Sequence, residues 1–364
     1  MNIPIAKPDI GKDEIQAVTE TMKSGWVTQG KKVEEFEQSF AQYCGVKHGV
    51  AVNTGTAALH IALAALDIKE GDEVITTPLS CVATTNPILY LNAKPVFADV
   101  DPLTLNIDPT LIEKRITHRT RAMLPVHLFG HPVDLDPLME VAEKHGLYVV
   151  EDAAESHGAK YKDKTVGSFG DVSCFSFYAD KHITTIEGGM ALTNDSELAD
   201  KMRLLRSFGM HKDKKFFHPI LGYNYKMPDI NASIGLVQLQ KLDNYIAKRR
   251  KNAVYLNKKL SDLNLKLPCE EKYAYNVYYV YHILADKESR KEKMVTKLEN
   301  HGIETRPLLS LIPAQPPYRK LKYNPNDCPK AQEAHKKGFY ISISPQLSLE
   351  ELDYIEAAVR KAAQ

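Results

Sequence analysis

Short apolar segments alternate with helix-like segments over the first half of the chain, and this alternation constrains the fold more than any other feature. Strands that alternate with helices of this length form a mostly parallel sheet with helices on both faces. Right-handed crossovers then place the carboxyl ends of the parallel strands along one edge. The predicted strands cover residues 49–53, 73–76, 95–100, 122–128, 147–150, 171–178 and 190–193, and predicted helices cover 9–23, 31–43, 55–66, 111–116, 135–145 and 196–207.

The second half of the chain predicts a second, smaller domain. The whole chain has 364 residues, which is more than one hydrophobic core usually organises. A long helical pattern at residues 229–263 is suited to connect two domains. The fold class is therefore α/β, with a large domain at residues 1–245 that carries a seven-stranded sheet and a small α+β domain at residues 246–364. In the small domain we expect strands at 277–284 and 340–344, helices at 288–300 and 349–363, and a Pro-rich loop from 305 to 317.

Composition excludes several classes of function. The formal net charge of +1 gives no basic surplus for nucleic acid. No apolar run approaches the ~20 residues needed to span a bilayer, and residues 1–12 lack the apolar core of a signal peptide. The five cysteines show no CxxC spacing, so we expect no metal site and a reducing cytoplasm.

The stretch from Asp171 to Gly189 holds the first candidate for chemistry. A strand-like run ends in a polar turn with one lysine, Lys181, and the chain re-enters apolar sequence through Gly188 and Gly189. A lysine held there inside the protein loses its charge more easily, and a neutral amine attacks an aldehyde to form a Schiff base. The alternative is a solvated surface lysine, which is the commoner case.

Two further segments supply an acid and an anion site. Asp152 follows the predicted strand 147–150, where α/β sheets bind ligands, and its carboxylate suits the ring nitrogen of pyridoxal phosphate. Thr54-Gly55-Thr56 opens the predicted helix 55–66, and the free amides of a helix start bind phosphate. Alone, Asp152 is also suited to cap a helix, and Thr-Gly-Thr is ordinary helix-start chemistry.

These three segments, in this order, resemble the DegT/DnrJ/EryC1/StrS family of sugar aminotransferases, which have the aspartate aminotransferase-like fold type I. The resemblance runs from Ile5 to the end and is most specific from Ser176 through Lys181 to Gly189. Within the family the chain is most similar to the GDP-perosamine synthases, which share Glu155 and a segment like residues 222–227.

The resemblance implies a catalytic Lys181, pyridoxal 5′-phosphate as cofactor and pyridoxamine 5′-phosphate as its aminated form. It implies L-glutamate as amino donor and a keto sugar as acceptor, most closely a nucleotide-linked 4-keto-6-deoxy sugar for surface polysaccharide such as lipopolysaccharide. Asn224 is expected to reach into the site of a second subunit, which implies a homodimer, although Asn224 alone would be a turn residue. The cofactor-binding residues implied are Gly55, Thr56, Asp152, Glu155, Ser176, Lys181 and Asn224, and the substrate-binding residues are Thr28, Gly30 and Arg306.

Three positions depart from the family pattern and keep other functions open. Ile186 replaces a glycine, Cys81 replaces an aromatic side chain over the ring, and Pro313 replaces a substrate-facing histidine. The acceptor is therefore also compatible with a nucleotide-free keto-deoxy-octulosonate-type sugar acid. Arg306 and the lysines of residues 208–226 are candidate anion contacts or plain surface cations. A pyridoxamine-dependent sugar 3-dehydratase is disfavoured because that group replaces the lysine with histidine, and retention of Lys181 argues against a non-catalytic regulator.

Overall fold

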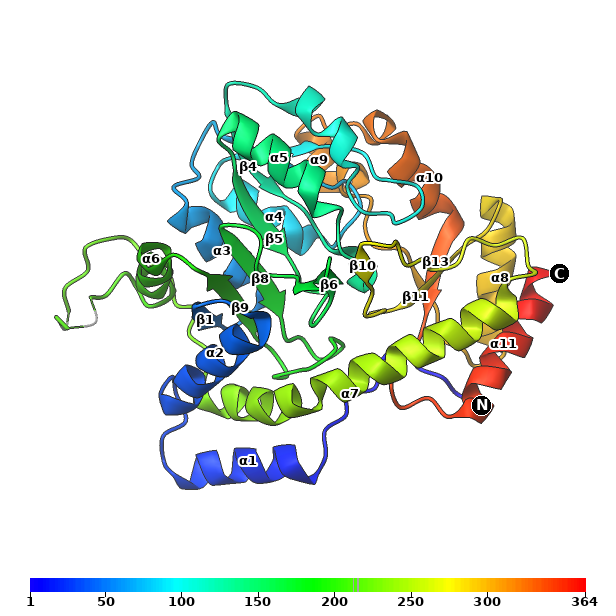
Figure 1. Cartoon of the computed structure of the whole chain (residues 1–364), viewed down its shortest axis with the longest axis horizontal. Helices are drawn as coiled ribbons and strands as arrows, with labels where there is room; N and C mark the ends of the chain where they lie inside the picture. The colour runs from blue at the N-terminus through cyan, green and yellow to red at the C-terminus, as the bar shows by residue number, and fades with distance from the viewer. Residues whose placement is uncertain (212, 215) are drawn as a thin grey trace.

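A seven-stranded sheet forms the centre of the larger part of the molecule (Figure 1). The computed structural model describes residues 1–211, 213–214 and 216–364. The strands follow the order β1-β9-β8-β5-β4-β2-β3, and all neighbours are parallel except β9, which is antiparallel to β1 and β8. This confirms the predicted mostly parallel sheet. The strand bounds are β1 His48–Val52, β2 Glu73–Thr76, β3 Lys94–Phe97, β4 Thr120–Leu124, β5 Tyr148–Asp152, β8 Val172–Ser176 and β9 Gly189–Thr193.

Helices cover both faces of this sheet, so its strands are buried on both sides. Val50 and Val52 of β1 pack in one core with α3 (Gly55–Ala65), whereas Ala51 packs in another with α2 (Lys31–Cys44). Successive side chains of a strand point to opposite faces, which explains the division. Helix α5 (Leu135–His145) covers β4 and β5, and α6 (Ser196–Arg206) follows β9.

One helix of 32 residues, α7 (Asp229–Leu260), connects the two parts of the molecule (Figure 1). Leu242 and Ile246 belong to the core beneath the large sheet, and Leu256 and Leu260 belong to the core of the smaller part. The predicted boundary between residues 245 and 246 falls inside this helix, where Tyr245 and Ile246 still pack in the core beneath the large sheet; the core of the smaller part begins at Ala253 along the helix.

The smaller part holds a three-stranded antiparallel sheet of order β11-β13-β12. Its strands are β11 (Tyr281–Leu284), β12 (Arg306–Pro307) and β13 (Gly338–Ile341), and α8 (Glu288–Asn300) and α11 (Leu349–Ala363) pack against it. Helix α11 begins with a capping box, because Ser348 Oγ accepts from the Glu351 N–H at 3.1 Å and Glu351 accepts from the Ser348 N–H at 2.7 Å.

Some predicted elements differ from the structure. Residues 277–279 are not a strand, because Val277 N–H and Tyr279 N–H donate to Gly130 and Phe129 instead of to a neighbouring strand. In place of the predicted helix 111–116 there are 3₁₀ turns at Pro109–Leu111 and Glu113–Arg115. The Pro-rich segment 305–317 contains a 3₁₀ turn at Ile312–Ala314 and the start of helix α9 (Pro316–Lys320), and helix α10 (Pro329–Lys337) follows it. A small sheet, β10-β6-β7, was not predicted; its strands are β6 Lys160–Tyr161, β7 Lys164–Thr165 and β10 Ala274–Tyr275.

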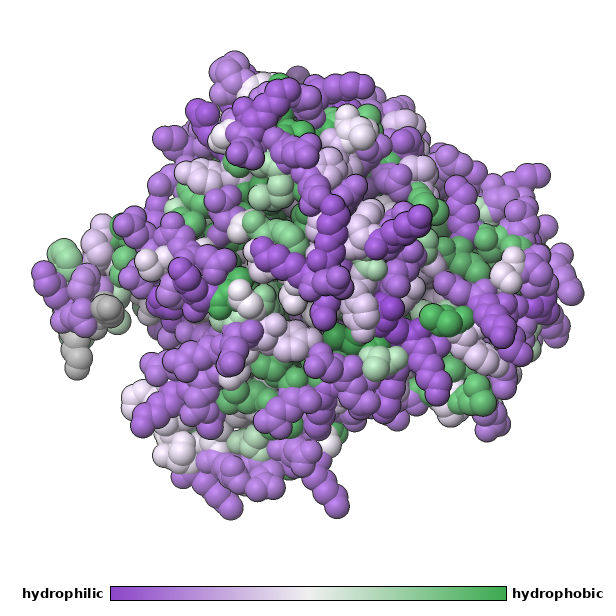
Figure 2. All heavy atoms as spheres, in the orientation of Figure 1, coloured by the Kyte–Doolittle hydropathy of each residue, from purple (hydrophilic) through white to green (hydrophobic). Residues whose placement is uncertain are grey.

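Helix α1 (Lys12–Lys23) starts three residues later than predicted and turns its apolar stripe outward. Ile15 and Met22 are exposed, whereas Glu14 is buried and held by Lys241 and Gln238 of α7. Between α1, α2 and α7 lies a cavity of about 760 Å³, and apolar residues are visible in this region in the lower part of Figure 2. In the described part of the chain, no helix combines the length and the apolar character needed to cross a membrane.

Candidate active site

The Lys181 side chain lies inside the protein, as predicted, with 13% of its surface exposed. It follows β8 in a tight turn, in which the Lys181 N–H donates to the Tyr178 carbonyl at 3.0 Å. Its Nζ donates to the Tyr279 hydroxyl at 3.3 Å, lies 4.4 Å from the centre of the Tyr279 ring and is 3.8 Å from Glu155 Oε1. The surface-lysine alternative is therefore wrong for this position.

Asp152 is the last residue of β5 and is almost fully buried, with 4% exposed. Thr84 Oγ1 donates to Asp152 Oδ2 at 2.7 Å, and Thr84 is bonded in turn to Ser80 at 2.8 Å. Burial raises the pKa of the Asp152 carboxyl, and the Thr84 hydrogen bond lowers it less. Within the described residues, no lysine or arginine forms an ion pair with Asp152. The site thus holds a buried acid that lacks a bonded cation, which a protonated ring nitrogen would supply.

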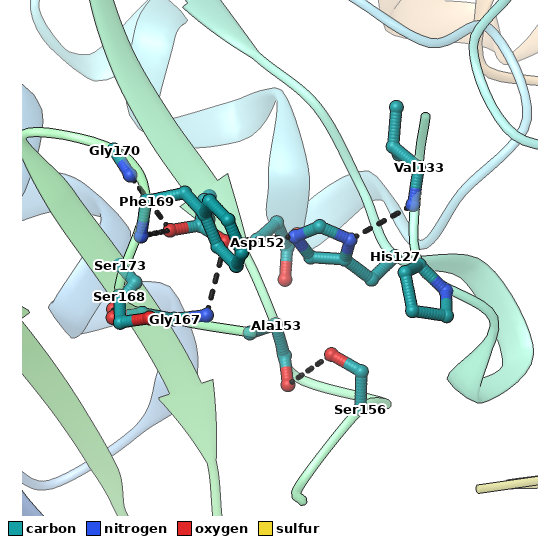
Figure 3. A network of polar contacts seen from close by, with 12 residues as sticks. His127, Val133, Asp152, Ala153, Ser156, Gly167, Ser168, Phe169, Gly170 and Ser173 are labelled. Atoms are coloured by element: carbon teal, nitrogen blue, oxygen red, sulfur yellow. Dashed lines mark hydrogen bonds and ion pairs between the residues drawn. The ribbon is translucent and has the colours of Figure 1, made fainter. Parts of the chain in front are cut away.

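A network of polar contacts that includes His127, Gly167 and Gly170 surrounds the end of the strand at Asp152 (Figure 3). Glu151 points to the opposite face of β5 and is fully buried, and His127 Nε2 donates to it at 3.1 Å. His127 Nδ1 accepts from the Val133 N–H at 3.1 Å, which leaves the ring hydrogen on Nε2. Glu151 also accepts from three backbone N–H groups, those of Gly167 (3.0 Å), Phe169 (2.9 Å) and Gly170 (2.8 Å). This network fixes the backbone from which Asp152 projects.

The start of α3 lies directly against the end of β8. A Cβ added to Gly55 would lie 2.7 Å from the Ser176 Cβ, so only glycine allows the two segments to approach this closely. Thr54 Oγ1 accepts from the Ala57 N–H at 3.1 Å and caps the helix. The amides of Gly55 and Thr56 stand in the first turn, where a helix leaves its N–H groups free for an anion.

These features fit pyridoxal phosphate. The acid at Asp152 suits the ring nitrogen, the helix start at Gly55 with Ser176 suits the phosphate, and the amine of Lys181 suits the aldehyde carbon. The three come from different elements whose ends meet at one edge of the sheet, as the alternating sequence pattern predicts.

Glu155 also lies at this edge and is buried. Its Oε2 accepts from the Phe129 N–H at 2.9 Å, and its Oε1 faces Lys181. Burial raises the pKa of the Glu155 carboxyl, while the charge of Lys181 acts in the opposite direction. Cys81 starts the turn that carries Thr84, so this departure from the family pattern lies beside the same site.

The remaining predicted residues are not in direct contact with Lys181. Thr28 and Gly30 lie on the loop between α1 and α2, where the Gly30 N–H donates to Asp229 Oδ1 at 2.7 Å. Arg306 on β12 is exposed and pairs with Glu304. Asn224 is exposed on the segment after α6. No hydrogen bond or ion pair of the described residues joins these four to Lys181, and Lys212 and Lys215 lie outside the described residues.

Three residues of the site were missed from the sequence. Thr84 binds Asp152, Tyr279 binds Lys181, and Asp229 holds the loop of Thr28 and Gly30. The hydroxyl-rich run Thr84-Thr85 was the only sequence signal for the first. Tyr279 lies in a Tyr-rich segment that the sequence predicts as a strand, and Asp229 lies at a predicted helix start. Neither pattern indicates a role in a site.

Among the described residues, no group of three or more His, Cys, Asp and Glu side chains is arranged to hold a metal ion.

Comparison with known proteins gives consistent matches over the full length. The profile of the DegT/DnrJ/EryC1/StrS aminotransferase family matches residues 8–360. The chain is 40% identical to the GDP-perosamine synthase of Caulobacter vibrioides, over 98% of this chain and 97% of that protein. It is 39% identical to the spore coat polysaccharide biosynthesis protein SpsC of Bacillus subtilis, over 98% and 96%.

A solved structure extends the match to three dimensions. The Spr1654 protein of Streptococcus pneumoniae superposes with a TM-score of 0.96 and 28% identity, and the match covers 100% of this chain and 98% of that one. Its structures include pyridoxal phosphate and pyridoxamine phosphate forms.

Proposed function

Because the chain belongs to the DegT/DnrJ/EryC1/StrS aminotransferase family, and is thus a sugar aminotransferase that depends on pyridoxal phosphate, we propose that it transfers the amino group of L-glutamate to a nucleotide-linked 4-keto-6-deoxy sugar. The observation that carries the proposal is the meeting of Lys181, Asp152 and the start of α3 at one edge of the sheet.

Bound pyridoxal phosphate supplies an aldehyde carbon and a ring that accepts electrons. In this proposal the Lys181 amine would hold the aldehyde carbon, and its free form would act as the general base and acid that moves the proton of the donor's α-carbon. Asp152 keeps the proton on the ring nitrogen. Gly55, Thr56 and Ser176 bind the phosphate.

The acceptor is proposed from the relatives and from the predicted substrate-binding residues. A GDP-perosamine synthase and a spore coat polysaccharide biosynthesis protein are both similar to this chain over nearly their full length, which supports a role in surface polysaccharide synthesis, such as that of lipopolysaccharide, in the cytoplasm. Thr28, Gly30 and Arg306 are proposed to bind the sugar nucleotide; the guanidinium of Arg306, which is 58% exposed and pairs with Glu304, would contact its phosphates.

The functional unit is proposed to be a homodimer with shared active sites. The segment after α6 extends away from the body of the molecule (Figure 1) and exposes large apolar side chains: Phe216 is 88% and Leu221 is 89% exposed. Apolar groups gain free energy when they are covered, and Asn224 lies on the same segment. If a second copy covers this segment, Asn224 of the first copy would lie at the phosphate site of the second copy.

The test is a transamination assay with the cofactor-loaded protein. Amino-¹⁵N-labelled L-glutamate is offered with a panel of nucleotide-linked 4-keto-6-deoxy sugars and with a nucleotide-free keto-deoxy-octulosonate, and the product is identified by mass spectrometry. We expect label in an amino sugar nucleotide and none with the Lys181→Ala variant. Label only in the nucleotide-free acid would contradict the proposed acceptor, and label with Lys181→Ala would contradict the role of the lysine.

A further inference from the structure

Lys181 and three residues around it, Tyr279, Phe129 and Glu155, form a closed circuit of contacts. Lys181 Nζ donates to the Tyr279 hydroxyl at 3.3 Å, and the Tyr279 N–H donates to the Phe129 carbonyl at 2.8 Å. The Phe129 N–H donates to Glu155 Oε2 at 2.9 Å, and Glu155 Oε1 returns to Lys181 Nζ at 3.8 Å. The circuit ties the amine to residues that are 26, 52 and 98 positions away in the sequence.

The turn that closes this circuit has an unfavourable backbone. Phe129 has a φ of 56°, and Gly130 follows with a φ of 92°. A side chain with a Cβ disfavours this left-handed region, and such conformations persist where the surrounding structure enforces them, often at functional sites. A Cβ on Gly130 would lie 2.9 Å from the Tyr278 nitrogen. The close approach of the two backbones thus requires glycine, and it brings Tyr279 under the site.

The Tyr279 backbone is held from both sides, so its side chain has little freedom. Its N–H is bonded to Phe129, and its carbonyl accepts from Arg249 Nη1 of α7 at 2.8 Å. Tyr279 is buried, and burial followed by the charges of Asp180 and Glu155 raises the pKa of its phenol well above the ordinary value. The phenol therefore stays neutral and keeps a lone pair free to accept from the amine.

We propose that Tyr279 is a positioning residue for Lys181: its hydroxyl and ring face hold the amine beside Glu155 before the cofactor arrives. A lysine side chain has many rotamers, and ordering it costs conformational entropy. When the Lys181 side chain is already ordered in the cofactor-free protein, a larger share of its encounters with the aldehyde leads to reaction. The hydroxyl accepts a hydrogen bond from the amine, and the ring attracts the ammonium form over its face.

The inference rests on the proposed role of Lys181, and its test separates cofactor binding from covalent capture. Cofactor-free protein is mixed with pyridoxal phosphate, and capture is followed by stopped-flow absorbance and by borohydride quenching, with the fraction modified at Lys181 read by peptide mass spectrometry. Non-covalent affinity is measured separately with pyridoxine 5′-phosphate, which lacks the aldehyde. Tyr279→Phe keeps the ring and removes the hydroxyl, and Tyr279→Leu removes both.

We expect Tyr279→Phe to slow capture at Lys181 by roughly 3- to 10-fold, as for loss of one hydrogen bond that orients a reacting group, and Tyr279→Leu to slow it further. The affinity for pyridoxine 5′-phosphate should stay within about twofold of the parent, because neither the acid nor the phosphate site changes. The matched control is Tyr281→Phe, two residues along the chain, where a buried hydroxyl donates to Asn257 Oδ1 at 2.7 Å. It should lower the melting temperature and leave capture unchanged.

Capture at the parental rate by Tyr279→Phe overturns the positioning role, and so does equal slowing by Tyr281→Phe, which would indicate general loosening of the smaller part. A parallel loss of affinity for pyridoxine 5′-phosphate in Tyr279→Phe also overturns it, because Tyr279 would then shape the cofactor site itself. Capture that persists at another lysine in Lys181→Ala overturns the role of Lys181, and with it this inference.

Discussion

At the scale of single residues, Asp152 is a buried carboxyl that requires a cationic partner to be stable in its charged form. Its carboxyl is enclosed with only the Thr84 hydroxyl and the Ala154 N–H as hydrogen-bond donors among the described residues. We expect Asp152→Asn to lower kcat by roughly 10²-fold or more, because a neutral amide cannot keep the ring nitrogen protonated while charge develops in the transition state. Steady-state kinetics with saturating cofactor measures this.

The control for this substitution is Asp136→Asn, which removes an exposed carboxylate paired with Lys162 on the surface. Surface ion pairs of this kind contribute little, so kcat should not change. Asp152→Asn with parental kcat and parental cofactor affinity would show that Asp152 is only a structural residue.

A buried histidine predicts how stability responds to acid. His157 packs among Phe40, Phe175 and Phe177, and burial, with a smaller contribution from the charge of Lys181, lowers its pKa to about 3. The unfolded chain binds a proton there below pH 6.5, its ordinary value, whereas the folded protein does not until about pH 3. The free energy of unfolding therefore falls as the pH falls through this window, by about 2 kcal/mol at pH 5 from this residue alone.

Thermal melts of the cofactor-free protein between pH 7.5 and pH 5 test this. His157→Leu keeps a similar volume and removes the titrating group, so its melting temperature should fall less over the same range. His118→Gln changes an exposed histidine and should keep the parental slope. If His157→Leu loses stability with pH as steeply as the parent, His157 is not a source of the acid sensitivity.

At the scale of elements, the loop that carries Thr28 and Gly30 depends on α7. Asp229 starts α7 and is buried, and its carboxylate accepts from three N–H groups at the start of α2: Gly30 (2.7 Å), Lys32 (3.2 Å) and Val33 (3.1 Å). It thus acts as the N-cap of a different helix. We expect Asp229→Ala to lower stability by about 1–3 kcal/mol and to raise the KM for the sugar substrate, with a smaller effect on kcat.

The matched control is Asp195→Ala. Asp195 caps α6 by accepting from the Glu197 and Leu198 N–H groups at 2.7 and 3.1 Å, and it has no contact with the loop of Thr28. It should lose similar stability and keep the parental KM. An Asp229→Ala variant that is destabilised but binds sugar normally would show that the loop is not a substrate loop.

The elements that the sequence predicted correctly are those formed by local periodicity. Helices α5, α8 and α11 begin and end at the predicted residues, because their apolar spacing, the glycine after α5 and the capping box of α11 are local signals. Residues 277–279 look like part of a strand and are instead bonded to the turn at Phe129 and Gly130. The positive φ of Phe129 arises from this distant contact, and no local pattern encodes it.

The same limit applies to the site. Lys181, Asp152 and Gly55 could be predicted because each stands at the end of a predicted strand or the start of a predicted helix, where α/β folds bind ligands. Tyr279 reaches the site because its N–H bonds to the distant turn at Phe129, and Asp229 reaches the loop because the start of α7 packs against the start of α2. Their positions depend on tertiary packing, which apolar spacing along one segment does not specify.

At the scale of the whole molecule, the open question of function is whether one chain forms a complete site. The segment after α6 extends from the body and exposes Phe216 and Leu221, which favours a covered state. Asn224 lies at the base of this segment, where it pairs with Ser207 at the end of α6. If a second copy provides the cover, symmetry requires each copy to give Asn224 to the other. Asn224 would then act in trans to the Lys181 of its own chain.

Mixing two inactive variants tests this arrangement. Lys181→Ala lacks the amine, and Asn224→Ala should bind the cofactor roughly 10- to 100-fold more weakly, as expected for a lost hydrogen bond to a charged group, so it is nearly inactive at limiting cofactor. After unfolding and refolding together, half of the dimers are mixed, and each mixed dimer has one intact site, so about a quarter of the parental activity should return. If Asn224 serves the site of its own chain, every site in the mixture lacks either the amine or the amide, and mixing restores nothing. Refolding each variant alone gives the baseline, and size-exclusion chromatography with light scattering shows whether dimers have formed.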